Sequence, residues 1–451
     1  MKKLHVLPYL WLVLLGLNSA MSGAAEDLDT GFSGLPGSTL EDFFTAAINY
    51  SPSLRIAEEN LNITGARKRA ANGRLLPQVN ANASISENRR NQFDLLQEFA
   101  GERYSLQLTQ ALFNWQSFSA RKQASLIEDQ AEAEYYYELA YLLTDVADKY
   151  FNVLQAEDAL DSISSELAAV TNQLAQIQSL YDRQLAQITD LYQGQASLAA
   201  VQAEQLFLEA ELALHEEALR SISGLDVGGL FTLDDLAAIP PLEYNMQFYV
   251  EQSRAQNQQI QAREYALRAA QEGIAEKQGA YMPRVTFIAQ RQDSDVGFDN
   301  LPINRTDNTY IGLDVSIPLY AGGSNRAAVS EARSRSRIAE SELRAARLEA
   351  GERVRSAYLQ AQSSAARTQA ARILVESTRL SAEAMQQGFA LGTVTTVDVL
   401  NALQDQYRAE RDLQQTRYEH VKFLLLLKRE TGTLEADDML EVGTWLIPPQ
   451  A

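Results

Sequence analysis

The segment Tyr310-Ile-Gly-Leu-Asp-Val-Ser-Ile-Pro-Leu-Tyr320 alternates apolar residues with small or polar ones. Ile311, Leu313 and Val315 fall on one face of a period-two pattern, and the residues between them fall on the other face. This alternation predicts a β-strand with one apolar face. The segment Tyr104-Ser-Leu-Gln-Leu-Thr-Gln-Ala-Leu-Phe113 repeats the pattern about 207 residues earlier. Two matching segments at this separation predict that the chain is an internal duplication.

Each of these two segments has an upstream companion that alternates in the same way. Polar segments over 87–102 and 291–308 separate the members of each pair and are predicted to be loops. Each half of the chain is therefore expected to carry one hairpin. The four strands are expected at about 78–89, 103–113, 284–292 and 309–320.

Strands of this length suit an outer membrane. At roughly 3.3 Å per residue and a tilt near 45°, a strand of about ten residues spans an apolar band about 25 Å tall. Four strands do not close a barrel, because the smallest single-chain barrels have about eight and every backbone group at membrane depth needs a partner. The chain must then oligomerise. An amphipathic sheet in a soluble domain is the alternative that the alternation alone leaves open.

Aromatic residues stand at both ends of the predicted strands. Phe113, Trp115 and Tyr320 are expected at one membrane interface. Tyr104 and Tyr310 are expected at the other interface. Packing in an ordinary protein core is the alternative for the same five residues.

Composition limits the function classes. The 451 residues include no cysteine, which excludes disulfides and thiolate chemistry. The formal net charge of −20 opposes nucleic-acid binding, which needs a cationic surface. Residues 1–25 combine Lys2 and Lys3 with an apolar run and small residues, as in a secretory signal peptide that is cleaved near Ala25 or after Ala20. An exported chain of this kind is expected in the periplasm, in the outer membrane or outside the cell.

The sequence outside the hairpins predicts unusually long helices. No Pro or Gly occurs between Trp115 and Gly194, so about 70 residues are expected to form one helix, roughly 105 Å long. Apolar residues from Ile163 to Tyr181 step by four and three, which is the 3.5-residue spacing of a coiled coil. A similar helix is expected in the second half, after a turn that contains Pro318, Gly322 and Gly323, where glycine tolerates positive φ. The predicted organisation is a signal peptide at 1–25, structural repeats at 26–258 and 259–433, and an irregular tail at 434–451.

Motifs for catalysis or cofactor binding are not evident. The histidines His5, His215 and His420 do not form a metalloprotease motif, and the sequence contains neither a P-loop nor a Gly-x-Ser-x-Gly elbow. We therefore expect no enzyme activity, no cofactor and no metal.

The helix tips carry the functional candidates. Asp190 and Asp398 occupy equivalent positions in the two halves, and an oligomer would array each as an acidic ring that attracts cations. A purely structural role is the alternative, because the helix dipole favours a carboxylate in the first turn, with Thr189 or Thr396 as a nearby cap.

These features together resemble the TolC-type outer-membrane efflux proteins over essentially the whole mature chain. The resemblance implies a homotrimer with a twelve-stranded β-barrel in the outer membrane and a twelve-helix tunnel through the periplasm. It also implies a passive conduit for efflux of toxic compounds or type I protein secretion, docked by a periplasmic adaptor and an inner-membrane transporter. The segments that carry the likeness are 105–113, 150–154, 317–323 and 388–403.

The resemblance also assigns roles at the tips. Asp398 matches a pore-facing acid of the family, and Asn401 occupies the position of a second one. Phe389 and Val394, which flank Gly392, stand where the family has a Tyr and an Arg that bond to a neighbouring tip. The matching partners here are Thr189 and Asp190. Because phenylalanine and valine cannot make those hydrogen bonds, the entrance is expected to be latched by apolar packing or more loosely.

Two other function classes share part of this pattern. A periplasmic coiled-coil adaptor would have the leader and the long helices, but it would lack four strands suited to a membrane. A secreted or surface structural protein would not need aromatic belts. Fractionation of the outer membrane separates both classes from a channel.

Overall fold

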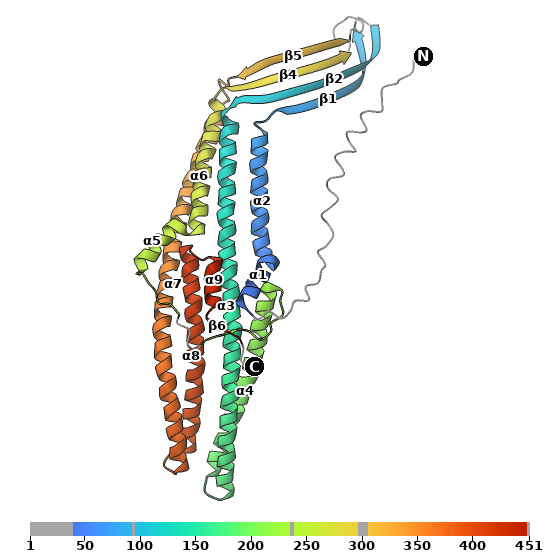
Figure 1. Cartoon of the computed structure of the whole chain (residues 1–451). Helices are drawn as coiled ribbons and strands as arrows, with labels where there is room; N and C mark the ends of the chain where they lie inside the picture. Colours follow the sequence, from blue (N-terminus) through green and yellow to red (C-terminus); the bar gives the residue numbers. More distant parts are fainter. Residues whose placement is uncertain (1–38, 93–94, 235–238, 296–304, 449–451) are drawn as a thin grey trace.

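The computed structural model describes residues 39–92, 95–234, 239–295 and 305–448. The predicted signal peptide at 1–25 lies outside these residues. The molecule is elongated, with a four-stranded sheet at one end and long helices that run away from it (Figure 1). Among the described residues, no helix contains a stretch long and apolar enough to cross a membrane.

The sheet joins the two halves of the chain. It is antiparallel, with the order β1-β2-β4-β5, and β2 pairs directly with β4. Each half therefore contributes one hairpin to a common sheet. The strands are β1 (Gln78–Gln92), β2 (Leu95–Asn114), β4 (Arg284–Asp295) and β5 (Thr306–Ser316).

Both predicted loops are shorter than the sequence suggests, and parts of them lie outside the described residues. β1 and β2 run through most of 87–102, where Arg89 Nε donates a hydrogen bond to Glu98 Oε1 at 2.7 Å. β4 and β5 likewise enter 291–308, where Arg291 Nη2 lies 2.8 Å from Asp307 Oδ2. Charged side chains that pair across the strands explain why these polar segments are strands.

β5 ends earlier than predicted, at Ser316 rather than at residue 320. Arg284, the first residue of β4, lies opposite Ser316, so the ladder has no partner strand beyond this point. Pro318 then lacks the N–H that would continue a ladder.

Four helices lie side by side next to the sheet in the order α2-α3-α6-α7, which we call the helix layer. The turn η1 (Gly279–Tyr281) connects α6 to β4. A Cβ on Gly279 would lie only 2.8 Å from the backbone nitrogen of Gln116, so glycine permits this close contact with α3. The helices are α2 (Pro52–Gly73), α3 (Trp115–Asp182), α6 (Gln258–Gln278) and α7 (Ser324–Ala390).

Beyond the layer, α3 and α7 each pair with a return helix, α4 (Ile188–Ser223) and α8 (Thr396–Thr431) respectively. α3 has 68 residues and α7 has 67. Ile163 and Val170 of α3 pack against Val201 of α4. A Cβ on Gly194 would lie 2.9 Å from Leu174 Cδ1, so this glycine allows α4 to approach α3 closely.

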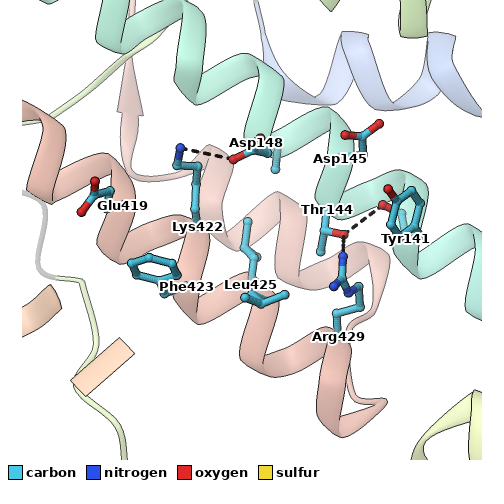
Figure 2. Close-up of a pocket in the computed structure, with 11 residues that line it drawn as sticks. Tyr141, Thr144, Asp145, Asp148, Glu419, Lys422, Phe423, Leu425 and Arg429 are labelled. Carbon is cyan, nitrogen blue, oxygen red and sulfur yellow. Dashed lines mark hydrogen bonds and ion pairs between the residues drawn. The ribbon is translucent and has the colours of Figure 1, made fainter. Parts of the chain in front are cut away.

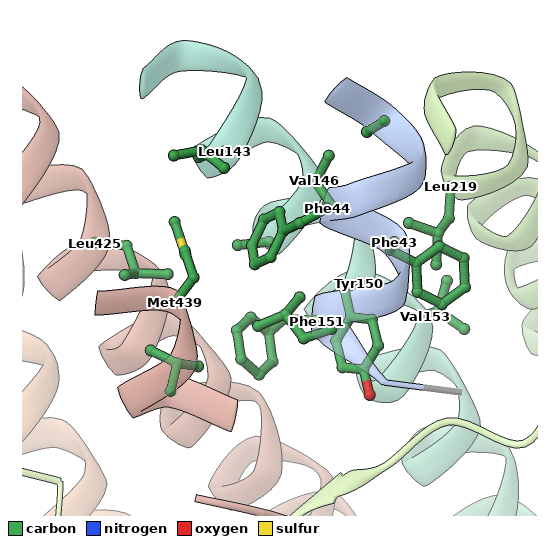
Figure 3. Close-up of a cluster of buried hydrophobic side chains, with 14 of the residues drawn as sticks. Phe43, Phe44, Leu143, Val146, Tyr150, Phe151, Val153, Leu219, Leu425 and Met439 are labelled. Atoms are coloured by element: carbon green, nitrogen blue, oxygen red, sulfur yellow. The ribbon is translucent and has the colours of Figure 1, made fainter. Parts of the chain in front are cut away.

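Short elements surround the helices at mid-length, and we call them the belt. Phe43 and Phe44 of the first helix pack with Tyr150 and Phe151 of α3 in the largest buried cluster (Figure 3). The Tyr150 hydroxyl donates to the carbonyl of Phe231 at 2.9 Å, which satisfies this buried group. The belt elements are α1 (Leu40–Tyr50), β3 (Thr232–Leu233), α5 (Met246–Gln256), α9 (Ala436–Gly443) and β6 (Leu446–Ile447).

The tail predicted to be irregular at 434–451 is structured in its described part. Met439 and Val442 of α9 are buried in the belt core, and Leu446 pairs with Leu233. Lys428 Nζ lies 2.7 Å from Asp438 Oδ1 and holds the helix to the end of α8. Contacts with residues about 200 positions earlier therefore order the tail.

Candidate membrane sheet and periplasmic entrance

Apolar residues line one face of the sheet. The register places Val79, Leu108, Ala289 and Ile311 opposite one another across all four strands. Val79 is 61% exposed and Ile311 is 68% exposed. An apolar face of this kind, open over neighbouring strands, is suited to contact with lipid.

A β-bulge places an aromatic residue on this face. The register of β2 against β4 shifts between Ala111 and Phe113, so that Phe113 lies opposite Val285. Without the extra residue, Leu112 would take that position. Only Asn114 separates Phe113 from the start of α3 at Trp115.

The five aromatic residues predicted at membrane interfaces are all exposed in the structure. Tyr104 and Phe113 lie in β2, nine residues apart, which is about 30 Å along a strand. Tyr320 lies beyond the end of β5. The complete set is Tyr104, Phe113, Trp115, Tyr310 and Tyr320.

The turn after β5 aims α7 away from the sheet. Gly322 and Gly323 have φ of 61° and 85°, in the left-handed region that favours glycine. The Ser324 hydroxyl donates to the carbonyl of Ala321 at 2.8 Å and does not cap the helix. Pro318 lies between the strand and this turn.

Each tip is closed by a capping box. The Thr395 hydroxyl and backbone N–H donate to Asp398 Oδ2 at 2.5 Å and 3.1 Å. In the other tip, the backbone N–H of Gln187 donates to Asp190 Oδ2 at 3.1 Å. The N-caps are therefore Thr395 and Gln187, and the suggested caps Thr189 and Thr396 are wrong because both lie inside the helices.

The hydrogen bonds from Thr395 also hold the pKa of the Asp398 carboxyl below its usual range. The side chain is exposed at the tip. Asn401, one turn further along α8, is exposed as well. The second tip therefore presents a carboxylate that stays ionised in mildly acidic solution.

Phe389 and Val394 pack within their own hairpin. Phe389 lies against the buried cluster of Ala382, Val399 and Leu403. A Cβ on Gly388 would overlap the side chain of Val394, so the glycine makes room for it. Gly392 has φ of 75° in the same turn.

The residues predicted as partners of these two in the other tip also bond locally. The Thr189 hydroxyl lies 3.4 Å from Gln187 Oε1, and Asp190 bonds to the same residue. In the single chain described here, the structure therefore does not join Phe389 or Val394 to Thr189 or Asp190.

Polar contacts join α3 to α8 along a line that we call the seam. Near the belt, Arg429 Nη1 donates to the Thr144 hydroxyl at 3.0 Å, and Lys422 Nζ lies 3.2 Å from Asp148 (Figure 2). Further toward the tip, the Tyr418 hydroxyl donates to Asp158 Oδ2 at 2.5 Å, and the Ser162 hydroxyl lies 3.4 Å from the carbonyl of Tyr407. Leu400 of α8 adds apolar contact with α3 and α4 near the tip.

A buried ion pair lies at the centre of the lower seam. Arg411 Nη1 lies 2.9 Å from Glu166 Oε2, and the Glu166 side chain is only 4% exposed. Hollows of about 550 Å³ and 460 Å³ flank the pair, and Arg411 lines both. Sequence reasoning missed this pair, because Glu166 directly precedes Leu167 of the coiled-coil pattern, at a position where a charged residue is common.

Glu157 of α3 is a half-buried carboxyl near the belt. Burial, and then the negative charges of Asp158, Glu216 and Asp161, raise its pKa to about 7. At neutral pH the protein therefore holds this group partly protonated.

We expect this group to make the protein more stable in mild acid. Its pKa in the folded chain lies above the ordinary value of 4.5, so its contribution is complete below about pH 4.5 and is lost as the pH rises through about 7. Discounted for solvent screening, the change is about 1 to 2 kcal/mol. The midpoint of thermal unfolding should change less between pH 5 and pH 8 in Glu157→Gln than in the parent. Glu204→Gln, which changes an exposed carboxyl of α4, should show the same change in midpoint as the parent.

A family model assigns most of the chain. The model for the outer membrane efflux protein family matches residues 45–225 and 249–433. These ranges include all four strands of the sheet and both tips.

Individual relatives agree with this assignment. The outer membrane protein TolC of Vibrio cholerae is 30% identical over 383 residues, which is 82% of this chain and 85% of that protein. The alkaline protease secretion protein AprF of Pseudomonas aeruginosa is 25% identical over 344 residues, covering 74% of this chain and 70% of AprF.

Solved structures share the fold. The outer-membrane channel OprN superposes with a TM-score of 0.76 at 19% identity, over 88% of this chain and 90% of OprN. VceC of Vibrio cholerae superposes with a TM-score of 0.74 at 20% identity, over 87% and 96% of the two chains. The predicted TolC-like architecture is confirmed at this level, and the chain belongs to the outer membrane efflux protein family.

Proposed function

We propose that three copies of this chain close into one conduit, with a twelve-stranded β-barrel and a twelve-helix tunnel. The observation that carries this proposal is the sheet of four strands with an apolar face and two free edges. In the described chain, β1 and β5 each pair on one side only, and α2 and α7 are the corresponding edges of the helix layer. Backbone groups at membrane depth require a partner, which a neighbouring copy supplies.

The protein is an outer-membrane exit duct for efflux or secretion, and its helices extend into the periplasm. We propose that its cargo is small toxic compounds or a secreted protein. A periplasmic adaptor and an inner-membrane transporter would supply the cargo, and the duct itself would be passive, without catalysis.

The apolar face of the sheet supports contact with outer-membrane lipid, and Leu106 and Leu313 add to its exposed apolar surface. Tyr104 and Phe113 lie on this face, whereas the register places Tyr310 opposite Gln290, on the other face of the sheet. We propose two structural repeats, which the sequence suggests at 26–258 and 259–433. The order of two helices, two strands, a long helix and a return helix recurs from α1 to α4 and from α5 to α8, and α5 begins at Met246, before the expected boundary.

We propose that the carboxylates of Asp190 and Asp398 form rings at the tunnel entrance. Three copies of each acid would lie around one axis, where fixed negative charge favours cations. Apolar packing of Phe389 and Val394 within their hairpin would replace hydrogen bonds between the tips.

Asp398→Asn is expected to weaken cation preference. The asparagine keeps an oxygen that accepts the Thr395 hydrogen bonds, so the cap survives while the charge is lost. In a planar bilayer under a salt gradient, the reversal potential should move toward zero. Asp405→Asn removes an exposed charge two turns further along α8 and serves as the control. Equal reversal potentials in the two variants would disprove the ring assignment.

Native mass spectrometry of the detergent-extracted protein tests the number of copies. The proposal predicts a particle of three chains. A particle with any other number of chains would contradict the twelve-stranded barrel.

A further inference from the structure

Five arginines form a straight row along the part of α7 next to the sheet. The row consists of Arg326, Arg333, Arg337, Arg344 and Arg355, all of which are exposed. Successive members are 7, 4, 7 and 11 residues apart. At 3.6 residues per turn they lie within about 40° of one line, and the row is roughly 44 Å long. We call these residues the arginine row.

The arginine row has no acidic partner among the described residues. Four of its members form no hydrogen bond or ion pair there, and Arg337 donates only to the Ser334 hydroxyl at 2.9 Å. Arg347 of the same helix, in contrast, lies 2.7 Å from Glu264 of α6. The chain has 59 acidic and 39 basic residues, so acids are not scarce. One exposed acid, Glu340, lies close to the same line without pairing to a member of the row, so the five arginines leave this surface with a net positive charge.

The internal duplication shows which way the row points. The return helices α4 and α8 begin about 208 residues apart, and this offset matches Arg326 with Phe118 and Arg344 with Tyr136 of α3. α3 has α2 on one side and α6 on the other, yet Phe118 is 39% exposed and Tyr136 is 47% exposed. These positions therefore point out of the helix layer. A helix of a neighbouring copy that packed beside α7 would likewise leave the arginine row exposed to solvent.

The belt identifies the face on which the row lies. Ala147 of α3, the counterpart of Arg355, is buried in the belt core. Tyr358, one turn after Arg355, packs against Tyr249 of α5 with ring centroids 5.9 Å apart. The row thus shares a face with the belt. Because a belt inside the tunnel would obstruct it, this face is the outer one, a step that rests on the proposed conduit.

We propose that the arginine row is a docking surface for an acidic periplasmic protein whose helix lies along α7. Guanidinium groups bind carboxylates with two parallel hydrogen bonds, and they lose little hydration in doing so. Acids placed whole turns apart on a partner helix would meet every member of the row. A membrane surface would reach only the end near Arg326, because screening limits its field to about 8 to 10 Å.

The test uses the full-length protein in nanodiscs of zwitterionic lipid and two synthetic helical peptides. One peptide carries glutamates with the spacing of the arginine row, and the other has the same composition with glutamates spread around the helix. The row variant combines Arg326→Gln, Arg333→Gln, Arg344→Gln and Arg355→Gln. The control variant changes the same net charge at arginines that form ion pairs with nearby acids, namely Arg55→Gln, Arg220→Gln, Arg335→Gln and Arg379→Gln.

We expect the row variant to bind the spaced peptide roughly tenfold more weakly than the parent, and the control variant to stay within roughly twofold. Equal affinity for the two peptides, or equal losses in the two variants, would overturn the proposal. If phosphatidylglycerol vesicles bind the row and the spaced peptide does not, the row is a lipid site and protein docking is wrong. Both variants should keep the parent's unit conductance. A parent without conductance would show that the conduit itself has failed, independently of the peptide result.

Discussion

Gly432→Ala is expected to disrupt assembly of the folded chain, at a cost of more than about 3 kcal/mol. Gly432 has φ of 79°, and an added Cβ would lie 2.6 Å from the carbonyl carbon of Gln256 and 2.7 Å from the Cα of Asn257. These are backbone atoms, so no side chain can rotate away. Folded yield in outer-membrane extracts and the midpoint of thermal unfolding measure the effect.

The cost is large because this glycine ends α8 at a buried junction with α7 and with the corner between α5 and α6. The carbonyl of Glu430 accepts from the Ser253 hydroxyl at 3.1 Å and from Asn257 Nδ2 at 2.9 Å. The Glu430 carboxylate, which is nearly fully buried, lies 2.8 Å from Arg353 Nε. Displacing the helix end would break this network and leave buried charge unpaired.

Gly392→Ala is the matched control for backbone strain. Gly392 also has positive φ, at 75°, but nothing lies within 4 Å of an added Cβ. This variant should be destabilised only by the cost of placing alanine in the left-handed region, about 1 to 2 kcal/mol. If Gly432→Ala were no worse than Gly392→Ala, the close junction at the end of α8 would be wrong.

Arg411→Gln is expected to loosen the seam between α3 and α8. It leaves the Glu166 carboxylate buried without its cation, which typically costs about 3 to 5 kcal/mol. The α7 and α8 hairpin would then separate from α3 more readily. Hydrogen exchange in 399–411 should accelerate, and open probability in a bilayer should rise.

Two further variants separate the ion pair from a general loss of charge. Arg408→Gln removes an exposed arginine one turn before Arg411, and hydrogen exchange in 399–411 should match that of the parent. Glu166→Gln combined with Arg411→Gln removes both charges and should recover much of the lost stability, because no charge remains buried alone. If hydrogen exchange in 399–411 is as fast in the double variant as in Arg411→Gln, the ion pair does not stabilise the seam.

Patterns local in the sequence predicted the main elements well. The alternation from Tyr310 to Ser316 lies in a strand, and the stretch without Pro or Gly after Trp115 is a single helix of 68 residues. The 3.5-residue spacing from Ile163 indicated a coiled coil, and α3 does pack against α4 there. These features depend on neighbours a few positions away, which the sequence shows directly.

Features that depend on distant residues were mispredicted or missed. β5 stops at Ser316 because β4 offers no partner further on, and α9 forms because Met439 finds a core made by other elements. Glu166 meets Arg411 across 245 positions, a distance at which periodicity carries no information. The N-caps at the tips lie one and two residues before the suggested positions, which is the usual uncertainty at helix ends.

Single-channel recording in a planar bilayer tests the central claim most directly. The parent and Arg411→Gln are each extracted in detergent, inserted under a salt gradient, and recorded for conductance steps and reversal potential. The conduit predicts discrete openings with cation preference, which occur more often in Arg411→Gln. Inserted protein that shows no conductance steps in either form would contradict an outer-membrane duct.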